Sequence, residues 1–360
     1  TTEIQGGSKT GKTALVCFLL MTCILPHSFS VTFTRPAVGS APPAIETRTL
    51  AVPLGGRAPH KSVLLFDNDG RFPFFKLQRM LLCHVRRRID DAVRRSGIFD
   101  GSGTLPWKSP TDQELAQLAN DWIARVHAVR PKSQDELRYA LKRAKKSFAV
   151  PDAPELCAFI QLSALQINGE RWCANAPSIT ALIVVDSLSA FWWEANEGAE
   201  ADRPANRNRY AALAQILREL KQIQDHTGSP MLLVNQGVLE GPPDKRKGTK
   251  QPPLNEAPLP GGKWWAQHLP CPPYSSIDSR QPQPESENST PQVDFHITLQ
   301  ATLPQALPSG TRESAARANI AMREQMLERL QIVGWLKARN RGYLGKFAFR
   351  VGDEALDVVG

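Results

Sequence analysis

The first thirteen residues place glycines, a lysine and a threonine at a spacing that suits phosphate binding. Gly6, Gly11, Lys12 and Thr13 fill the pattern G-x-x-x-x-G-K-[ST], and an apolar run follows directly. Glycines let successive backbone N–H groups surround an anion, and a following helix turns its positive end toward the phosphates. The alternative is a glycine-rich turn that binds nothing. The pattern favours a nucleotide site formed by Gly6, Gly7, Ser8, Lys9, Thr10, Gly11, Lys12 and Thr13.

A carboxylate with the chemistry of a metal ligand ends the most apolar segment, 180–186. This residue is Asp186. In a phosphate-loop site, a carboxylate at a strand end holds the Mg²⁺ that bridges the β- and γ-phosphates, together with the loop hydroxyl. The alternative is a residue that only begins a turn or caps a helix. We expect Thr13 and Asp186 to hold the metal.

Two further strand ends carry polar residues that could act on the γ-phosphate. Asp69 closely follows the apolar segment 62–66, and an Asp there could activate the attacking water as a general base, although its side chain is short. Gln236 ends the segment 231–236 and could hydrogen-bond the γ-phosphate as a sensor. For both residues the alternative is a structural role at the end of a buried strand.

The elements that would position these residues alternate between strands and helices, which predicts an α/β domain with a mostly parallel sheet. In such sheets ligands bind at the carboxyl ends of the strands, where the polar residues lie. Predicted strands are 1–5, 62–70, 122–129, 180–186, 231–236 and 293–299, with a final antiparallel hairpin of 347–351 and 355–359. Predicted helices are 12–25, 74–95, one that begins with the capping pair Ser133 and Glu136, 207–226 and 311–334, besides a short helix within 97–117.

Composition is that of a globular protein, with 41% hydrophobic and 22% charged residues in a chain of 360. One domain with insertions can reach this length. The 29 prolines cluster, and with glycine they mark surface loops at about 34–60 and 237–262, while the polar stretch 272–291 is predicted to be disordered. We therefore expect a single domain, 1–360, with three insertions.

The net charge of +9 favours acidic partners, nucleic acid first, although it could equally serve solubility. The basic group best placed to contact a phosphate backbone lies in the loop that follows Gln236, on the ligand side of the predicted sheet. This group consists of Lys245, Arg246, Lys247 and Lys250.

Cysteine usage and hydropathy bear on the compartment. The six cysteines form no C-x-x-C pair, as expected of reduced, intracellular thiols. The apolar run 14–25 ends at Pro26 and is shorter than the about 20 residues that a membrane span needs. The chain begins at Thr1, already inside a predicted strand, so we expect a fragment that lacks the segment leading into the sheet.

The order of these strand ends resembles the RecA-type recombinase family and its DNA-repair paralogues. After the phosphate loop come Asp67-Asn68-Asp69-Gly70-Arg71-Phe72, then Ile183-Val184-Val185-Asp186-Ser187, then Val234-Asn235-Gln236. The similarity covers about 1–33, 54–96, 122–147 and 178–236. The resemblance implies a RecA-like P-loop ATPase core that binds ATP and Mg²⁺ in the nucleus. It also implies a mediator role in homologous-recombination repair of double-strand breaks and crosslinks, with other recombinase paralogues and single-stranded or branched DNA as partners, and no membrane.

Two departures from the family pattern shape these expectations. Asp69 stands where recombinases place their catalytic Glu, which puts vigorous ATP hydrolysis in doubt. Residues 194–202 are acidic where recombinases have a basic DNA-contacting loop, which argues against a filament formed by this chain alone. The alternatives are an active DNA-stimulated ATPase with Asp69 as base, and a scaffold without DNA binding whose nucleotide site is vestigial. A metabolic P-loop kinase is a further alternative, but the sequence shows no signature of a pocket for a kinase's second substrate.

Overall fold

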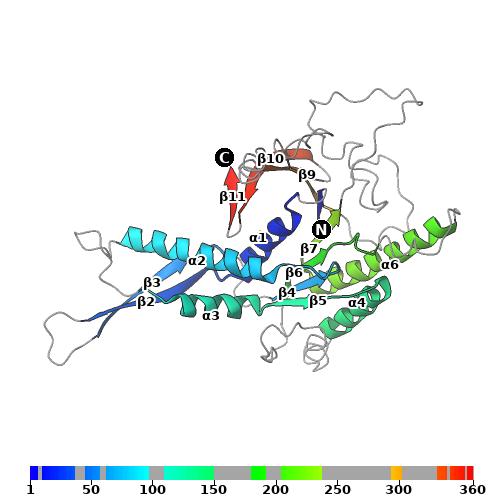
Figure 1. Cartoon of the computed structure of the whole chain (residues 1–360). Helices are drawn as coiled ribbons and strands as arrows, with labels where there is room; N and C mark the ends of the chain where they lie inside the picture. Colours follow the sequence, from blue (N-terminus) through cyan, green and yellow to red (C-terminus); the bar gives the residue numbers. More distant parts are fainter. Residues whose placement is uncertain are drawn as a thin grey trace, which may run out of the picture.

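A strongly twisted β-sheet forms the centre of the molecule (Figure 1). The computed structural model describes residues 1–6, 10–36, 45–56, 62–96, 109–149, 180–191, 204–236, 293–301, 331–338, 341–352 and 355–359. The strands of this sheet are β1 (Thr2–Gly6), β4 (Ser62–Asp67), β5 (Val126–Val129), β6 (Thr180–Asp186), β7 (Met231–Gln236), β8 (Phe295–Ala301), β9 (Gln331–Ala338), β10 (Gly342–Val351) and β11 (Leu356–Val359). Within the described ranges these nine strands lie in the order β11-β10-β9-β8-β1-β7-β6-β4-β5.

The sheet is parallel from β8 to β5 and antiparallel from β8 to β11. This arrangement confirms the predicted mixed α/β fold with a mostly parallel centre and antiparallel strands at the C-terminal edge. Strand β1 lies in the middle, between β7 and β8, although the next strand of the sheet along the chain is β4. The connection that leaves β1 runs toward β4, whereas the connection that leaves its neighbour β7 runs the opposite way, to β8. In α/β sheets, ligands bind in the crevice at such a switch in direction.

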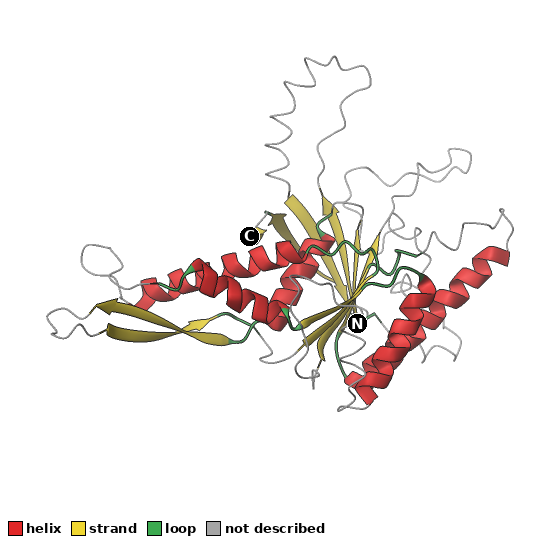
Figure 2. Cartoon of the chain, turned by 60° about the horizontal axis from the view of Figure 1, so that its bottom comes forward, coloured by secondary structure: helices red, strands yellow, loops and turns green. Residues whose placement is uncertain are grey.

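Helices cover both faces of the sheet (Figure 2). They are α1 (Lys12–Ile24), α2 (Phe74–Ser96), α3 (Asp112–Ile123), α4 (Gln134–Ala149) and α6 (Pro204–Thr227). Val63 and Leu65 of β4 join the core that α1, α2 and α3 share, whereas Leu64 and Phe66 join the core under α4 and α6. Because side chains alternate along a strand, both faces of β4 are buried, which explains its continuous apolar sequence. Among the described helices, none combines the length and the apolar character that crossing a membrane requires.

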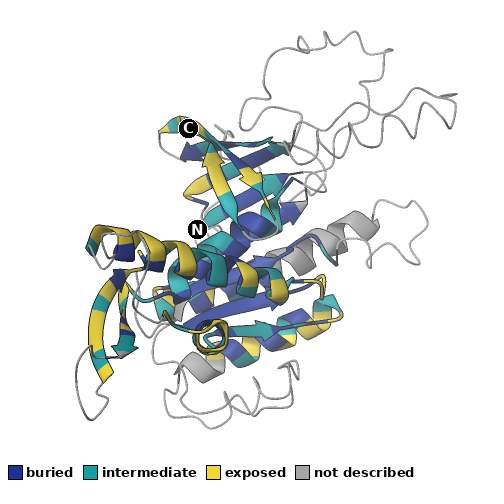
Figure 3. Ribbon diagram, turned by 60° about the vertical axis from the view of Figure 1, so that its left-hand side comes forward, coloured by how far each residue is buried: buried dark blue, intermediate teal, exposed yellow. Residues whose placement is uncertain are grey.

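A two-stranded antiparallel ribbon extends beside α2 and α3, formed by β2 (Ser28–Pro36) and β3 (Ile45–Pro53). The prediction of a flexible loop at 34–60 is wrong for 34–36, which end β2, and for 45–53, which form β3. The apolar side chains of Val31, Phe33 and Val52 reach the core, while most of the ribbon is exposed (Figure 3). The proline and glycine content of the whole stretch concealed this alternation of apolar and polar residues.

Two other predicted boundaries differ from the structure. Of the strand predicted at 122–129, only 126–129 form a strand, which is β5. Trp122 and Ile123 are instead the last residues of helix α3. Trp122 lies on the buried side of that helix together with Leu115 and Ala119, at helical spacing. The helix predicted at 311–334 overlaps β9 at residues 331–334, and its remaining residues lie outside the described part, as do those of 237–262 and 272–291.

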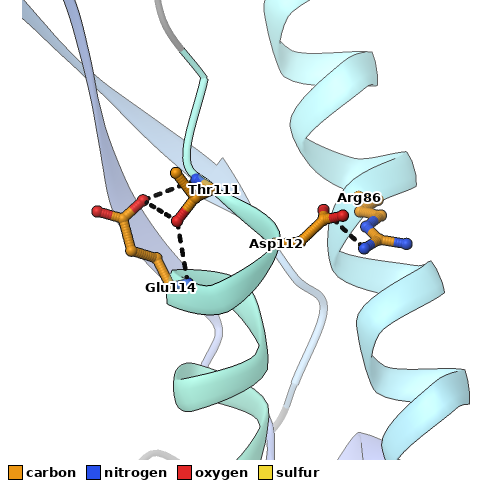
Figure 4. Close-up of polar contacts among 4 residues, drawn as sticks. All are labelled: Arg86, Thr111, Asp112 and Glu114. Atoms are coloured by element: carbon orange, nitrogen blue, oxygen red, sulfur yellow. Dashed lines mark hydrogen bonds and ion pairs between the residues drawn. The ribbon is translucent and has the colours of Figure 1, made fainter.

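Side chains cap the first turns of α3 and α4. Thr111 Oγ1 accepts the Glu114 N–H at 3.2 Å, and the Glu114 carboxylate accepts the Thr111 N–H at 2.7 Å, a capping box that the sequence analysis missed (Figure 4). At α4, Ser133 Oγ accepts the Glu136 N–H at 3.2 Å as predicted. The Glu136 carboxylate, however, accepts the N–H of Lys132 at 2.7 Å.

Candidate nucleotide-binding site

The two glycines of the phosphate-loop pattern both stand where a side chain would collide. A Cβ at Gly6 would lie 2.4 Å from Thr10 Oγ1 and 2.8 Å from the Leu299 carbonyl oxygen. Gly11 has φ +74°, a left-handed conformation that favours glycine, and it precedes the first residue of α1. A Cβ at Gly11 would lie 2.5 Å from Ile332 Cδ1. The two glycines therefore sit in close contact with their surroundings, Gly6 beside β8 and Gly11 beside the C-terminal strands.

Lys12 is the first residue of α1. Its Nζ donates to the Gly6 carbonyl oxygen at 2.8 Å, so the side chain turns back toward the end of β1. Burial lowers the pKa of the Lys12 ammonium to about 8, and the carboxylates of Asp186 and Asp69 oppose that shift. A cation that is poorly hydrated and held among backbone groups gains strongly from an arriving anion.

Asp186 ends β6 beside Asp67 of β4 in the parallel register, and only 8% of it is exposed. Burial raises the pKa of the Asp186 carboxyl to about 7, with further increases from Asp69 and Asp67 and a decrease from Lys12. A divalent cation would relieve the repulsion between these carboxylates. Across the described residues, no three His, Cys, Asp or Glu side chains form a ready-made metal cage. Mg²⁺ is commonly held by one or two protein oxygens together with phosphates and water.

Asp69 lies in the turn after β4 and is exposed to solvent. Partial desolvation raises the pKa of its carboxyl, as does Asp67, while Arg71, Lys12 and a hydrogen bond with Ser187 lower it. The structure thus brings Asp69 into electrostatic contact with both Lys12 and Asp186. A carboxyl with a raised pKa in such a place can take a proton from water.

Asp67, only two residues earlier, has a different role. Its carboxylate accepts hydrogen bonds from the backbone N–H groups of Arg71 and Phe72 at 3.1 and 3.2 Å. It also accepts a hydrogen bond from Arg130 Nε at 2.8 Å. The Arg130 guanidinium in turn lies over the ring of Phe74, 6.0 Å from its centre. With all these partners and 1% exposure, Asp67 organises the turn that presents Asp69.

Asn68 and Ser187, which the sequence analysis left without a role, join the ends of β4 and β6. The Asn68 N–H donates to the Asp186 carbonyl oxygen at 2.8 Å, and Asn68 Nδ2 donates to the Ser187 carbonyl oxygen at 2.9 Å. Ser187 Oγ is also 3.0 Å from Ser189 Oγ. The signal for both residues was their position directly beside a candidate acidic residue at a strand end.

The remaining predicted site residues are only partly placed. Gln236 ends β7, and its backbone lies beside Gly6 in the parallel register. The structure describes the backbone of Gln236 but not its side chain. Gly7, Ser8 and Lys9 also lie outside the described residues, and so does the basic group Lys245, Arg246, Lys247 and Lys250.

Taken together, Lys12, Asp186 and Asp69 from three separate segments meet at the carboxyl ends of β1, β6 and β4. The site places an ammonium beside a buried and an exposed carboxylate, and the chemistry of these groups suits an anion, a divalent cation and a water molecule. Comparison with known proteins adds no identification: no family model matches the chain, and no curated protein matches it.

Proposed function

We propose that this protein binds Mg²⁺–ATP at its phosphate loop and acts as a RecA-like recombinase paralogue in homologous-recombination repair. The observation that carries the nucleotide part is the electrostatic grouping of Lys12, Asp186 and Asp69. A partly buried ammonium faces the buried carboxylate of Asp186 and the exposed carboxylate of Asp69, which is the charge arrangement that a phosphate and a bridging cation would complete.

In the proposed complex the Thr13 hydroxyl and Asp186 would hold Mg²⁺, which neutralises phosphate charge when bound. Lys12 would exchange the Gly6 carbonyl for a phosphate oxygen, and Gln236 would sense the γ-phosphate. Asp69 would accept the proton of the attacking water. Its side chain is one methylene shorter than Glu, so we expect binding to be more important than turnover.

The proposed cellular role depends on the sequence resemblance. Leu182 to Trp193 is very similar to the paralogue called X-ray-repair cross-complementing protein two, and Leu65 to Asp69 resembles the same paralogue. By this resemblance the protein works in the nucleus within a complex of recombinase paralogues and helps the recombinase to act on single-stranded or branched DNA. Lys245, Arg246, Lys247 and Lys250 are the residues proposed to contact DNA.

Equilibrium binding of a fluorescent ATP analogue with Mg²⁺ tests the nucleotide part. We expect saturable binding that Lys12→Ala abolishes and Lys142→Ala leaves unchanged, because Lys142 is exposed on α4, on the other face of the sheet. Equal affinity of the two variants would overturn the proposed nucleotide site.

Single-turnover ATP hydrolysis, with and without single-stranded DNA, separates the proposal from its alternative. We expect slow turnover, reduced further by Asp69→Ala. Fast, DNA-stimulated hydrolysis would instead identify an active ATPase. An unchanged rate in Asp69→Ala would remove Asp69 as the base.

The cellular part is tested by co-purification from nuclear extract and by survival after DNA crosslinking. We expect recombinase paralogues among the co-purified proteins and poor survival of cells that carry Lys12→Ala. Normal survival with this variant would favour a scaffold whose nucleotide site is vestigial.

A further inference from the structure

A cluster of buried polar side chains crosses the middle of the sheet, beside the strand that leads into the phosphate loop. The buried members are Glu3 of β1, Asn235 of β7, and His296 and Thr298 of β8, and the half-buried Gln5 of β1 adjoins them. On the opposite face of β1, Ile4 is fully buried in the apolar core. Central parallel strands are normally apolar on both faces, so this cluster is a departure that calls for a physical explanation.

Glu3 is the centre of the cluster. Asn235 Nδ2 donates to Glu3 Oε1 at 2.5 Å, and His296 Nε2 lies 3.8 Å from Glu3 Oε2 and 3.1 Å from Gln5 Oε1. Thr298 Oγ1 lies 3.5 Å from His296 Nδ1. Glu3, Asn235 and His296 are each at most 6% exposed, so these contacts are shielded from water and join β7, β1 and β8.

The buried pair Glu3 and Asn235 contributes little net stability to the contact between β1 and β7. Burying a carboxyl group and an amide costs free energy that their hydrogen bond only partly recovers. Moreover, within the described part of the structure, the buried Asn235 Oδ1 accepts no hydrogen bond. An apolar pair of similar size would stabilise the sheet at least as well, so stability alone does not explain this one.

The position of the pair suggests a different use. Glu3 lies three residues before Gly6, the first glycine of the phosphate loop, and Asn235 immediately precedes Gln236. In the parallel register Gly6 lies beside Gln236 and Gln5 beside Asn235. A directional hydrogen bond between Glu3 and Asn235 therefore fixes the end of β7 relative to the backbone that enters the loop.

We propose that Glu3 and Asn235 are positioning residues whose buried hydrogen bond couples the end of β7 at Asn235–Gln236 to nucleotide binding at the phosphate loop. This inference rests on the proposed nucleotide function and deepens it. Coupling of this kind is reciprocal: nucleotide binding favours one arrangement of the end of β7, and that arrangement strengthens nucleotide binding. Loss of the pair leaves the loop less preorganised and weakens binding, even if the fold is intact.

The test compares thermal stability with Mg²⁺–ATP-analogue affinity in four variants of the full chain. In Glu3→Leu/Asn235→Leu we expect unchanged or higher stability, but nucleotide binding weaker by about five- to twentyfold, within the usual range of coupling. Asn235→Ala should weaken binding similarly. Glu3→Gln keeps the oxygen that accepts from Asn235 Nδ2, so it should bind within about twofold of the natural chain.

Val234→Ala is the matched control, because Val234 is the neighbouring residue and is buried in the apolar core on the other face of β7. It should lower stability and leave nucleotide affinity unchanged.

If the double leucine variant or Asn235→Ala binds like the natural chain, or if Val234→Ala weakens binding as much as they do, the inference is overturned while the proposed function stands. Should the double variant not fold, Asn235→Ala against Val234→Ala decides. Failure of the unaltered chain to bind nucleotide would overturn the proposed function, and this inference with it.

Discussion

Burial of ionisable groups dominates the chemistry of this protein at the scale of single residues. Lys12, Asp186 and Glu3 all lie in places where the charged form is poorly solvated, and the pKa of each is displaced accordingly. For Lys12 and Asp186 a ligand with phosphate and Mg²⁺ would restore the lost solvation. Glu3, three residues before Gly6, is not one of the proposed ligands, and its displaced pKa makes the free energy of unfolding depend on pH.

The stability of the fold is predicted to depend on the ionisation of Glu3. Burial raises the pKa of Glu3 from 4.5 to about 7, and the hydrogen bond from Asn235 opposes this shift. Between these values the native state holds a proton that the unfolded chain has released, so the free energy of unfolding falls as the pH rises through this window. Urea unfolding at about pH 5 and about pH 7.5 should show a loss of up to about 3 kcal/mol from this residue.

Glu3→Gln removes this ionisable group and should flatten the pH dependence of unfolding. The raised pKa of Asp186 contributes a dependence of the same sign, so some slope should remain in the variant. An identical slope in the natural chain and in Glu3→Gln would contradict the prediction.

At the scale of the elements, the phosphate loop depends on strands that follow it by more than three hundred residues. Ile332 of β9 and Phe349 of β10 pack against Gly11, and both belong to the core that contains α1. These contacts support the start of α1 directly after the loop. The C-terminal strands are therefore part of the nucleotide site, although they contribute none of its predicted ligands.

Gly11→Ala is predicted to be more destabilising than Gly228→Ala. Both glycines have positive φ, +74° and +63°, so both substitutions carry a backbone cost of about 1–2 kcal/mol. A Cβ at Gly228 meets open space, whereas one at Gly11 lies 2.5 Å from Ile332 Cδ1. Chemical denaturation of the two variants isolates the steric part, and Ile332→Ala should recover some of it in a Gly11→Ala background. Equal losses in the two variants would mean that β9 does not support the loop.

The sequence was sufficient to predict those elements and residues whose signal is local. The strands of the parallel centre are continuous apolar runs, and Lys12, Asp186 and Asp69 follow from a motif and from strand ends. The β2–β3 ribbon was missed because prolines and glycines beside it obscured its short alternation. The polar cluster could not be predicted, since Glu3 meets Asn235 and His296 across 232 and 293 residues of chain. Nothing in the separate segments indicates that these three side chains share one buried space.

At the scale of the whole molecule, the carboxyl ends of the parallel strands collect residues from distant segments at one edge of the sheet. Helices on both faces and the antiparallel strands beyond β8 hold this edge in place. A ligand bound there contacts several elements at once, and it should therefore stabilise the fold as a unit.

Mg²⁺–ATP is predicted to raise the melting temperature of the chain. A ligand at a hundred times its dissociation constant adds about 2.7 kcal/mol to the stability of the state that binds it. A thermal scan with nucleotide, with and without a chelator of Mg²⁺, measures the effect. Lys12→Ala should show no shift, and a shift of equal size in this variant would indicate binding elsewhere.

The packing of Ile332 and Phe349 against Gly11 also has a genetic consequence. A premature stop codon or a frameshift shortly before codon 332 leaves every predicted nucleotide ligand encoded, yet it removes Ile332 and Phe349, which pack against Gly11. Such alleles should behave in complementation assays like alleles of Lys12, and a screen that scores only the motif would classify them as harmless.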